Sequence, residues 1–180
     1  WLRYMQNGNG SWGNDFSRTA YTAWALAESG TRDACIDNAI SYMKSCDFPS
    51  IDAYELALYA NALTAQDPGS TAAKECLNRI ENTAAQDKDT ACWHSEIPTI
   101  FHSFGRTADI ETTALAAYAL IKGNGNPQII NKALTWLIRQ KDPMGGWQST
   151  QATILTIRAL AAGLSTPAPQ EQDLNIAIMA

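Results

Sequence analysis

Four residues that could bind a metal ion or transfer a proton lie between positions 92 and 102, namely Cys92, His94, Glu96 and His102. Thiolates, imidazoles and carboxylates are the usual protein ligands of zinc, and they tend to recur at short, fixed spacings. These four come from a single stretch and match no recognised ligand spacing. We therefore expect them to serve loop packing and solvent contact, with no metal and no cofactor.

Two acids, Asp109 and Glu111, form a second candidate for chemistry. A carboxylic acid that faces a cavity can act as a general acid or base. Here the pair opens a helix predicted over 109–122, where carboxylates commonly cap the first turn and offset the helix dipole. Capping is the role we expect, so the pair does not predict a catalytic site.

The cysteines are a third candidate. Cys35 and Cys46 are eleven positions apart on one predicted helix, about 16 Å at the helical rise, which is too far for a disulfide. Cys76 and Cys92 could be bridged, since one is in a predicted helix and the other in the following loop. No Cys-x-x-Cys pair is present, so we expect buried free thiols, and cysteine usage does not fix the redox compartment.

Composition indicates a globular domain. A chain of 180 residues with 46% hydrophobic and 17% charged residues can bury a core within a single domain. The net charge of −5, with no cluster of Lys or Arg, argues against a nucleic-acid partner. No apolar run reaches membrane-spanning length, and the chain opens on Trp1 inside a repeat, as expected for a piece of a longer protein.

An internal repeat organises the helices that must position these residues. Trp136, Leu137, Gly145 and Trp147 recur at identical separations as Trp1, Leu2, Gly10 and Trp12. Ala-rich helices with almost no charge along their middles, predicted to lie inside, alternate with amphipathic helices predicted to lie outside. The inner helices are expected over 19–29, about 50–65, 109–122 and 150–163, and the outer ones over 31–45, 71–84 and 127–140, with a stub at 1–5.

The resulting fold class is all-α. We expect an incomplete arc of about seven or eight helices of an α/α toroid over residues 1–165. Residues 86–107 form a long loop, expected to be functional or tied down as a small hairpin. Residues 166–180 are expected to be a linker followed by a strand over 173–180, because apolar residues alternate there with period two.

One resemblance would make the chain an enzyme. The pattern of Gln6, Gly10 and Trp12 is similar to one in terpene cyclases and related toroids, where it ties helices together. The chain lacks the aspartate cluster of cyclases and the Asp, Cys and His zinc set of prenyltransferases, so the enzyme remains an alternative. A glycan-binding toroid is a further alternative, and it depends on exposure of Trp12, Trp93 and Trp147.

A broader resemblance covers nearly the whole chain. Residues 136–163, WLIRQKDPMGGWQSTQATILTIRALAAG, resemble the end of the thioester-containing domain of the alpha-2-macroglobulin and complement family, with its Gly-Gly-aromatic-x-Ser-Thr-Gln signature. Residues 19–30, 51–66 and 108–121 look like successive inner helices of the bacterial branch of that family. The resemblance implies a large macroglobulin-like parent, extracellular, periplasmic or on the cell surface, that traps proteases.

The reactive group of that family has no counterpart here. Its thioester joins a Cys to a Gln within Gly-Cys-x-Glu-Gln, and none of Cys35, Cys46, Cys76 and Cys92 has these neighbours. The His that assists transfer in some complement members is missing from residues 13–18. We therefore expect a non-catalytic scaffold, with self-association of the truncated arc. The resemblance implies that its partners are proteases, reached through the parent, and adjoining β-rich domains, one of which would start with the strand at 173–180.

Overall fold

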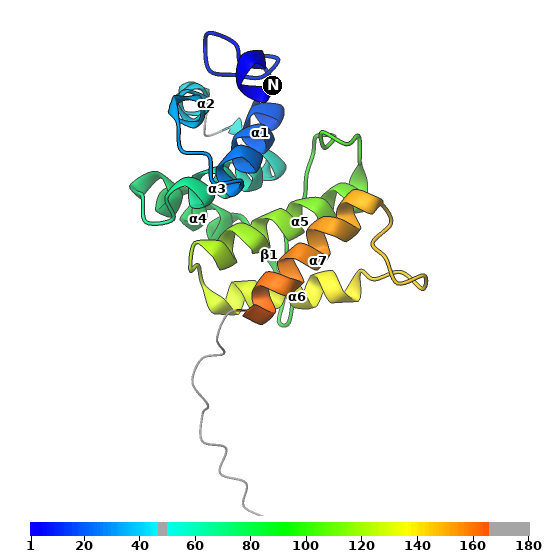
Figure 1. The fold of residues 1–180 in the computed structure, drawn as a ribbon. Helices are drawn as coiled ribbons and strands as arrows, with labels where there is room; N and C mark the ends of the chain where they lie inside the picture. The colour runs from blue at the N-terminus through cyan, green and yellow to red at the C-terminus, as the bar shows by residue number, and fades with distance from the viewer. Residues whose placement is uncertain (47–49, 166–180) are drawn as a thin grey trace, which may run out of the picture.

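The computed structural model describes residues 1–46 and 50–165, and in these residues it is built almost entirely from helices (Figure 1). The only strands in this part form a small antiparallel hairpin of β1 (Ala85–Gln86) and β2 (Ala91–Cys92). The predicted all-α class is confirmed. The helices are η1 (Leu2–Met5, 3₁₀), α1 (Phe16–Glu28), α2 (Ala34–Ser45), α3 (Ala53–Gln66), α4 (Thr71–Thr83), α5 (Gly105–Lys122), α6 (Pro127–Arg139) and α7 (Thr150–Ser165).

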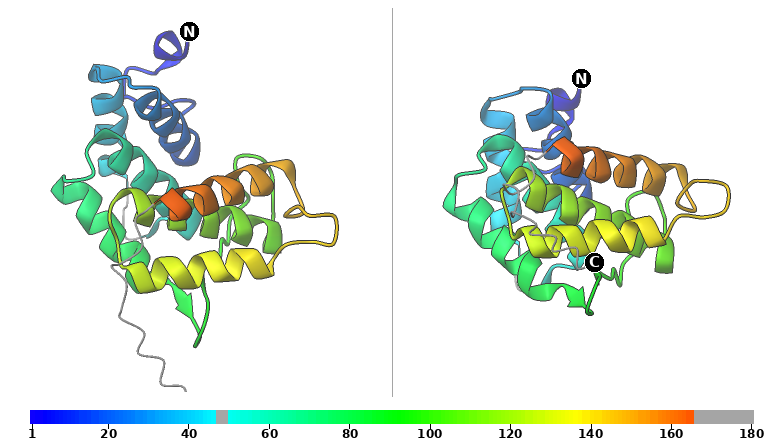
Figure 2. Two further views of the ribbon diagram at one scale, coloured as in Figure 1. Left: turned by 60° about the horizontal axis from the view of Figure 1, so that its bottom comes forward. Right: turned by 90° about the horizontal axis from the view of Figure 1, so that it is seen from below.

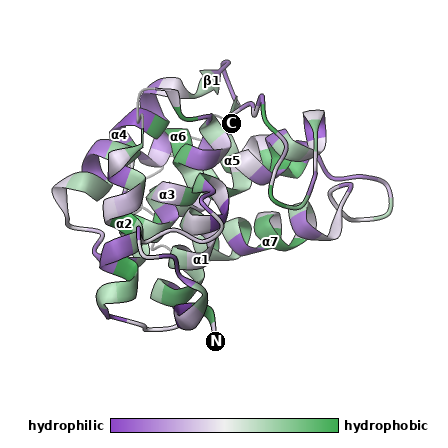
Figure 3. Ribbon diagram, turned by 90° about the horizontal axis from the view of Figure 1, so that it is seen from above, coloured by the Kyte–Doolittle hydropathy of each residue, from purple (hydrophilic) through white to green (hydrophobic). Residues whose placement is uncertain are grey.

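The helices fall into two alternating sets. α1, α3, α5 and α7 pack against one another in succession, while α2, α4 and α6 pack against members of that series (Figure 2). In α5 every residue from Ile110 to Leu120 is buried, as expected of a helix surrounded by protein. By contrast, α4 buries only Ala73, Cys76, Leu77 and Ile80, and Figure 3 colours it with both hydrophilic and hydrophobic residues.

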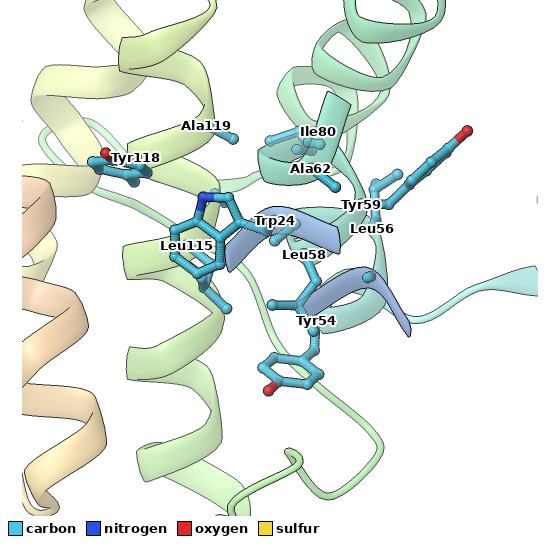
Figure 4. Close-up of a cluster of buried hydrophobic side chains, with 14 of the residues drawn as sticks. Trp24, Tyr54, Leu56, Leu58, Tyr59, Ala62, Ile80, Leu115, Tyr118 and Ala119 are labelled. Atoms are coloured by element: carbon cyan, nitrogen blue, oxygen red, sulfur yellow. The ribbon is translucent and has the colours of Figure 1, made fainter. Parts of the chain in front are cut away.

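Small side chains allow the first set of helices to approach closely. Ala57 and Ala60 of α3 and Ala114 and Ala117 of α5 are fully buried, and short side chains let backbones pack without cavities. Asn61 ties the two helices together, because its amide nitrogen donates to the backbone carbonyls of Ala57 and Leu115 at 2.8 and 2.9 Å. Larger side chains from several helices fill the remaining core (Figure 4).

The starts of α1 and α2 differ from the sequence prediction. α1 begins at Phe16, three residues before the predicted position, because the Asp15 carboxylate accepts the backbone N–H of Arg18 and caps the helix. The predicted start of α2 at Thr31 is also wrong, since the helix begins at Ala34. The cap is Asp33, whose carboxylate accepts the N–H of Cys35. In both cases the N-cap is an aspartate in extended backbone, a residue type that is strongly preferred at this position.

The stretch between α4 and α5 is partly a hairpin, as the sequence allowed, and α5 begins at Gly105, four residues before the predicted Asp109. Because of this extra turn, Asp109 and Glu111 lie beyond the first turn of α5. The strand predicted over 173–180 and the linker before it lie outside the described residues. No helix in the described part is long and apolar enough to cross a membrane.

Candidate functional site

Trp12 and Trp147 hold two helix junctions in the same way. The indole N–H of Trp12 donates to the carbonyl of Leu2 at 2.9 Å, and that of Trp147 donates to the carbonyl of Leu137 at 2.6 Å. The backbone N–H of each tryptophan donates at 3.0 Å to a threonine hydroxyl of the next helix, Thr19 or Thr153. The repeat in the sequence is therefore a repeat of hydrogen bonds.

The glycines of the repeat are required by the turn that precedes each tryptophan. Gly10 and Gly145 have φ values of 90° and 92°, a backbone conformation that strains any other residue. A Cβ on Gly10 would also collide with the backbone of Asn38 in α2. Gln6 completes the first junction, since its side-chain amide donates to the carbonyls of Gly10 and Cys35, both at 2.8 Å.

A third junction of the same type escaped the sequence analysis. The indole N–H of Trp93 donates to the carbonyl of Ile80 in α4 at 2.8 Å, and its backbone N–H donates to the hydroxyl of Thr113 in α5 at 3.1 Å. The threonine follows the tryptophan by twenty residues here, but by seven and six in the other two. A search at fixed separation could not detect it, although a Trp preceding an Ala-rich helix was a usable signal.

The three tryptophans are not exposed, which corrects the premise of the glycan-binding alternative. Trp12, Trp93 and Trp147 are 4%, 2% and 5% exposed. Ring faces enclosed by helices cannot stack on a sugar, so these residues serve the junctions.

Asp109 and Glu111 do not cap α5, and the expectation of a capping pair is wrong. The N-cap is Phe104, without a side-chain hydrogen bond, and no acid lies in the first turn. Asp109 instead accepts hydrogen bonds from the ring Nδ1 of His94 at 2.9 Å and from the backbone N–H of Ser95 at 3.1 Å. It holds the preceding loop against the helix.

Glu111 is fully buried and accepts the Ser103 hydroxyl at 2.6 Å and, more weakly, the Ser149 hydroxyl at 3.5 Å. Its Oε2 atom has no partner. Burial raises the pKa of this carboxyl, and hydrogen bonds from Ser103, Thr99 and Ser149 oppose the rise. Glu111 thus joins the loop before α5 to the start of α7.

The four metal-capable residues do not converge. Cys92 Sγ lies 3.6 Å from His94 Nε2, whereas Glu96 and His102 are exposed. The backbone N–H of Glu96 donates to Asp52 at 2.9 Å, and His102 has φ 61°. Within residues 1–46 and 50–165, no group of three or more His, Cys, Asp and Glu side chains could hold a metal ion.

All four cysteines are free thiols. Cys76 and Cys92 are buried as expected, whereas Cys35 and Cys46 are only half-buried. Burial raises the pKa of Cys76 to about 12, so this thiol is protonated at neutral pH and packs as an apolar group.

A cation and two aromatic rings fill the space where α1, α5 and α7 meet. The guanidinium of Arg158 lies 4.6 Å from the ring centroids of both Trp24 and Tyr118. Glu28 closes the cluster, because its carboxylate pairs with Arg158 at 2.7 Å and accepts the Tyr118 hydroxyl at 3.1 Å. Figure 4 shows Trp24 beside Leu115 and Tyr118 of α5.

The cyclase alternative required a cavity lined by aromatic rings and carboxylates. A cleft of about 1140 Å³ lies instead between α4 and the turn from α5 to α6, with Leu77, Gly123 and Gly125 among its lining residues. No aromatic side chain lines this cleft, and Glu81 is its only acid. The aromatic rings and the carboxylate between α1, α5 and α7 instead contact Arg158 and one another. This cleft therefore differs in its lining from the cavity that the cyclase alternative calls for.

An all-α domain whose helix junctions are held by buried tryptophans matches a known family model. Residues 3–162 match the model of the A-macroglobulin TED domain. The chain is 27% identical over 171 residues to complement C3 of Lethenteron camtschaticum, covering 88% of this chain and 10% of that protein. It is 28% identical over 161 residues to ovostatin of Gallus gallus, covering 83% of this chain and 11% of that protein.

A third relative is thioester-containing protein 1 allele R1 of Anopheles gambiae, which is 26% identical over 180 residues, covering 96% of this chain and 12% of that protein. The chain spans about a tenth of the length of these curated relatives. The protein belongs to the alpha-2-macroglobulin family and represents its thioester-domain region.

Proposed function

We propose that this domain is a non-catalytic scaffold within a large macroglobulin-like protein that traps proteases. The observation that supports this most strongly is the set of three tryptophan junctions at Trp12, Trp93 and Trp147, each joining a helix of one set to a helix of the other. Together with the Ala-rich packing of α3 against α5, they make a rigid shell. No side chain of the resembling family's thioester chemistry is part of it.

The absence of a thioester is proposed from the neighbours of the four cysteines. None of the four cysteines is followed by the Glu-Gln that a thioester of this family needs, and Cys76, the most deeply buried, is fixed in its protonated form. In the parent, a thioester would lie upstream of the region matched here, and this shell would shape the compartment around it.

The partners and location of the parent follow from the same proposal. We expect proteases to contact the whole protein, and β-rich domains to adjoin this one. The parent would be a bacterial protein that acts in the periplasm, on the cell surface or outside the cell. The net charge of −5 supports a role without nucleic acid.

The full-length parent provides the test of trapping. It is incubated with a broad-specificity endopeptidase, and cleavage of a large protein substrate and of a short peptide are followed in parallel. Trapping should suppress the first and spare the second, because a caged protease still admits small substrates. Equal loss of both activities would indicate ordinary active-site inhibition, and no loss of either would refute the proposal.

The domain alone provides the test of its lack of catalysis. Incubation with methylamine followed by intact-mass measurement should show no adduct, since no internal thioester is present to be attacked. A stoichiometric adduct that is prevented by alkylating the thiols first would show that one of these cysteines carries an acyl bond.

A further inference from the structure

Cys92, His94 and Asp109 form a chain of contacts that the scaffold role does not use. Cys92 ends β2, His94 follows two residues later, and Asp109 lies in α5. Cys92 Sγ is 3.6 Å from His94 Nε2, and His94 Nδ1 is 2.9 Å from Asp109 Oδ2. The imidazole is therefore held between a thiol and a carboxylate by its two different nitrogens.

The carboxylate selects the tautomer of the imidazole. Since ionised Asp109 can only accept a hydrogen bond, Nδ1 of His94 carries the proton that is donated to it. In the neutral ring, the lone pair of Nε2 is then free to accept the proton of the Cys92 thiol. A nucleophile next to a base that a third group orients is the arrangement by which proteins activate cysteine.

The surroundings of Cys92 make this base necessary. Burial and the negative charges of Asp109 and Asp87 raise the pKa of the Cys92 thiol, so little thiolate exists at neutral pH without proton transfer. The pair of Cys92 and His94 has no third ligand for a metal in the described part of the chain. Cys92 is 8% exposed to solvent, and the His94 side chain beside it is exposed. Only a small reagent could therefore reach the sulfur.

We propose that Cys92 is a reactive thiol, activated by His94 and oriented through Asp109, that is modified by small cationic disulfides to give a mixed disulfide. The Cys92 sulfur attacks one sulfur of the reagent as its proton passes to His94 Nε2, a new S–S bond forms and the original S–S bond breaks. The departing sulfur leaves as a thiolate and takes the proton from His94. Cys92 is oxidised, and the released half of the reagent is reduced.

The preference for a cation follows from the two carboxylates that act on the thiol. Asp109 and Asp87 give the Cys92 site a negative potential, which concentrates cations and repels anions. Cystamine is therefore the chosen probe, and the anionic disulfide dithiodiglycolate is its matched counterpart.

The folded domain contains its own reference thiols. Cys35 is more exposed than Cys92, with Asp33 and Arg3 as its charged neighbours, and Cys76 is buried and reports unfolding. The domain is treated with cystamine, and the modified fraction of each cysteine is followed by peptide mass mapping. We expect Cys92 to react faster than Cys35 despite its deeper burial, and faster with cystamine than with dithiodiglycolate.

Two variants test the mechanism. His94→Gln keeps the size of the side chain but cannot accept the proton, so the rate at Cys92 should fall about tenfold or more while Cys35 is unchanged. Asp109→Asn can still accept from Ser95 but reverses the tautomer of His94, and should lower the rate at Cys92 similarly. Reaction of Cys76 would show that a variant has unfolded. The role of His94 is then judged from the other variant.

An unreactive Cys92 in the native protein would overturn the proposal. A rate of Cys92 modification that is unchanged or increased in His94→Gln would also overturn it. The imidazole would then only shield the thiol from the reagent and would not act as a base. Equal rates with cystamine and dithiodiglycolate would overturn the preference for cations.

Discussion

At the scale of single residues, the tryptophans of the junctions combine the two properties of an indole. The ring fills the corner between two helices, and the N–H donates a hydrogen bond to a backbone carbonyl of the preceding helical segment. Trp147 does both, because it is 5% exposed and bonds to Leu137 at 2.6 Å.

Replacement of Trp147 by alanine should therefore be severe. We expect Trp147→Ala to lower the free energy of unfolding by about 3–5 kcal/mol, the usual cost of removing a buried aromatic side chain. Urea unfolding followed by circular dichroism measures the loss. Trp1→Ala is the control, since Trp1 is 82% exposed and should change stability little. A midpoint unaffected by Trp147→Ala would refute the packing of the junction.

Ionisation of Glu111 should make the free energy of unfolding depend on pH. Its pKa is raised above 4.5 in the folded protein, so the folded state holds the proton to higher pH than the unfolded state. The corresponding stability is fully present below pH 4.5 and is lost as the pH rises through the folded pKa. In Glu111→Gln this loss should be absent.

The measurement is the free energy of unfolding of the native protein and of Glu111→Gln, followed from pH 4 to pH 8. The native protein should lose stability relative to the variant as the pH rises, because only it must ionise a buried carboxyl. Taking the difference removes contributions common to both, including that of Glu55, whose pKa is also raised by burial. Parallel curves would show that Glu111 ionises without cost.

At the scale of helices and loops, Asp52 connects more than one element. It caps α3 by accepting the N–H of Tyr54 at 2.8 Å, within a capping box completed by Glu55. The same carboxylate accepts the Ser95 hydroxyl at 2.8 Å and the Glu96 N–H at 2.9 Å. It therefore fixes the loop before α5 as well as the start of α3.

We accordingly expect Asp52→Ala to cost more than an ordinary cap. Loss of a typical N-cap side chain lowers stability by about 0.5–2 kcal/mol. The cost of Asp52→Ala should exceed that of Ser70→Ala, which removes the cap of α4 and a local hydrogen bond to the carbonyl of Asp67. Amide hydrogen exchange should also quicken at Ser95 and Glu96 in Asp52→Ala. Equal losses in the two variants, with unchanged exchange, would show that the loop is held by other contacts.

At the scale of the whole molecule, exposed apolar side chains gather at the two ends of the helical series. Trp1, Tyr4 and Met5 are 82%, 92% and 53% exposed at one end, and Ile154 and Ile157 of α7 are 54% and 53% exposed at the other. Surfaces of this kind commonly mark contacts with other protein. They are where the predicted arc would meet the remainder of a toroid.

The isolated domain should therefore self-associate through these ends. Sedimentation velocity should show a weight that rises with concentration, and Ile157→Glu should reduce the rise. Ile138→Glu is the matched control, because Ile138 is similarly exposed at 57% but lies on α6, in the other helical set. Monomers at every concentration, or equal effects of the two substitutions, would count against an open arc.

The helices and two of their junctions could be predicted from local features of the amino-acid sequence. Alanine-rich segments with almost no charge along their middles predicted α3, α5 and α7, and the repeat at fixed separation predicted that Trp12 and Trp147 would be equivalent. These features are local, because periodicity, small residues and turn glycines act within a few residues of one another. The family resemblance, read from the same segments, is confirmed by the match over residues 3–162.

The contacts of the polar side chains depend on tertiary packing, and the sequence did not predict them. Asp109 resembled a helix cap in the sequence, but α5 begins at Gly105, and the carboxylate is therefore carried to His94 and Ser95. Trp93 was considered as an exposed aromatic residue, but it is buried and bonds to Ile80 of α4 and to Thr113 of α5, twenty residues later in the chain. A hydrogen bond between distant residues depends on how the helices pack, and neither spacing nor periodicity records that packing.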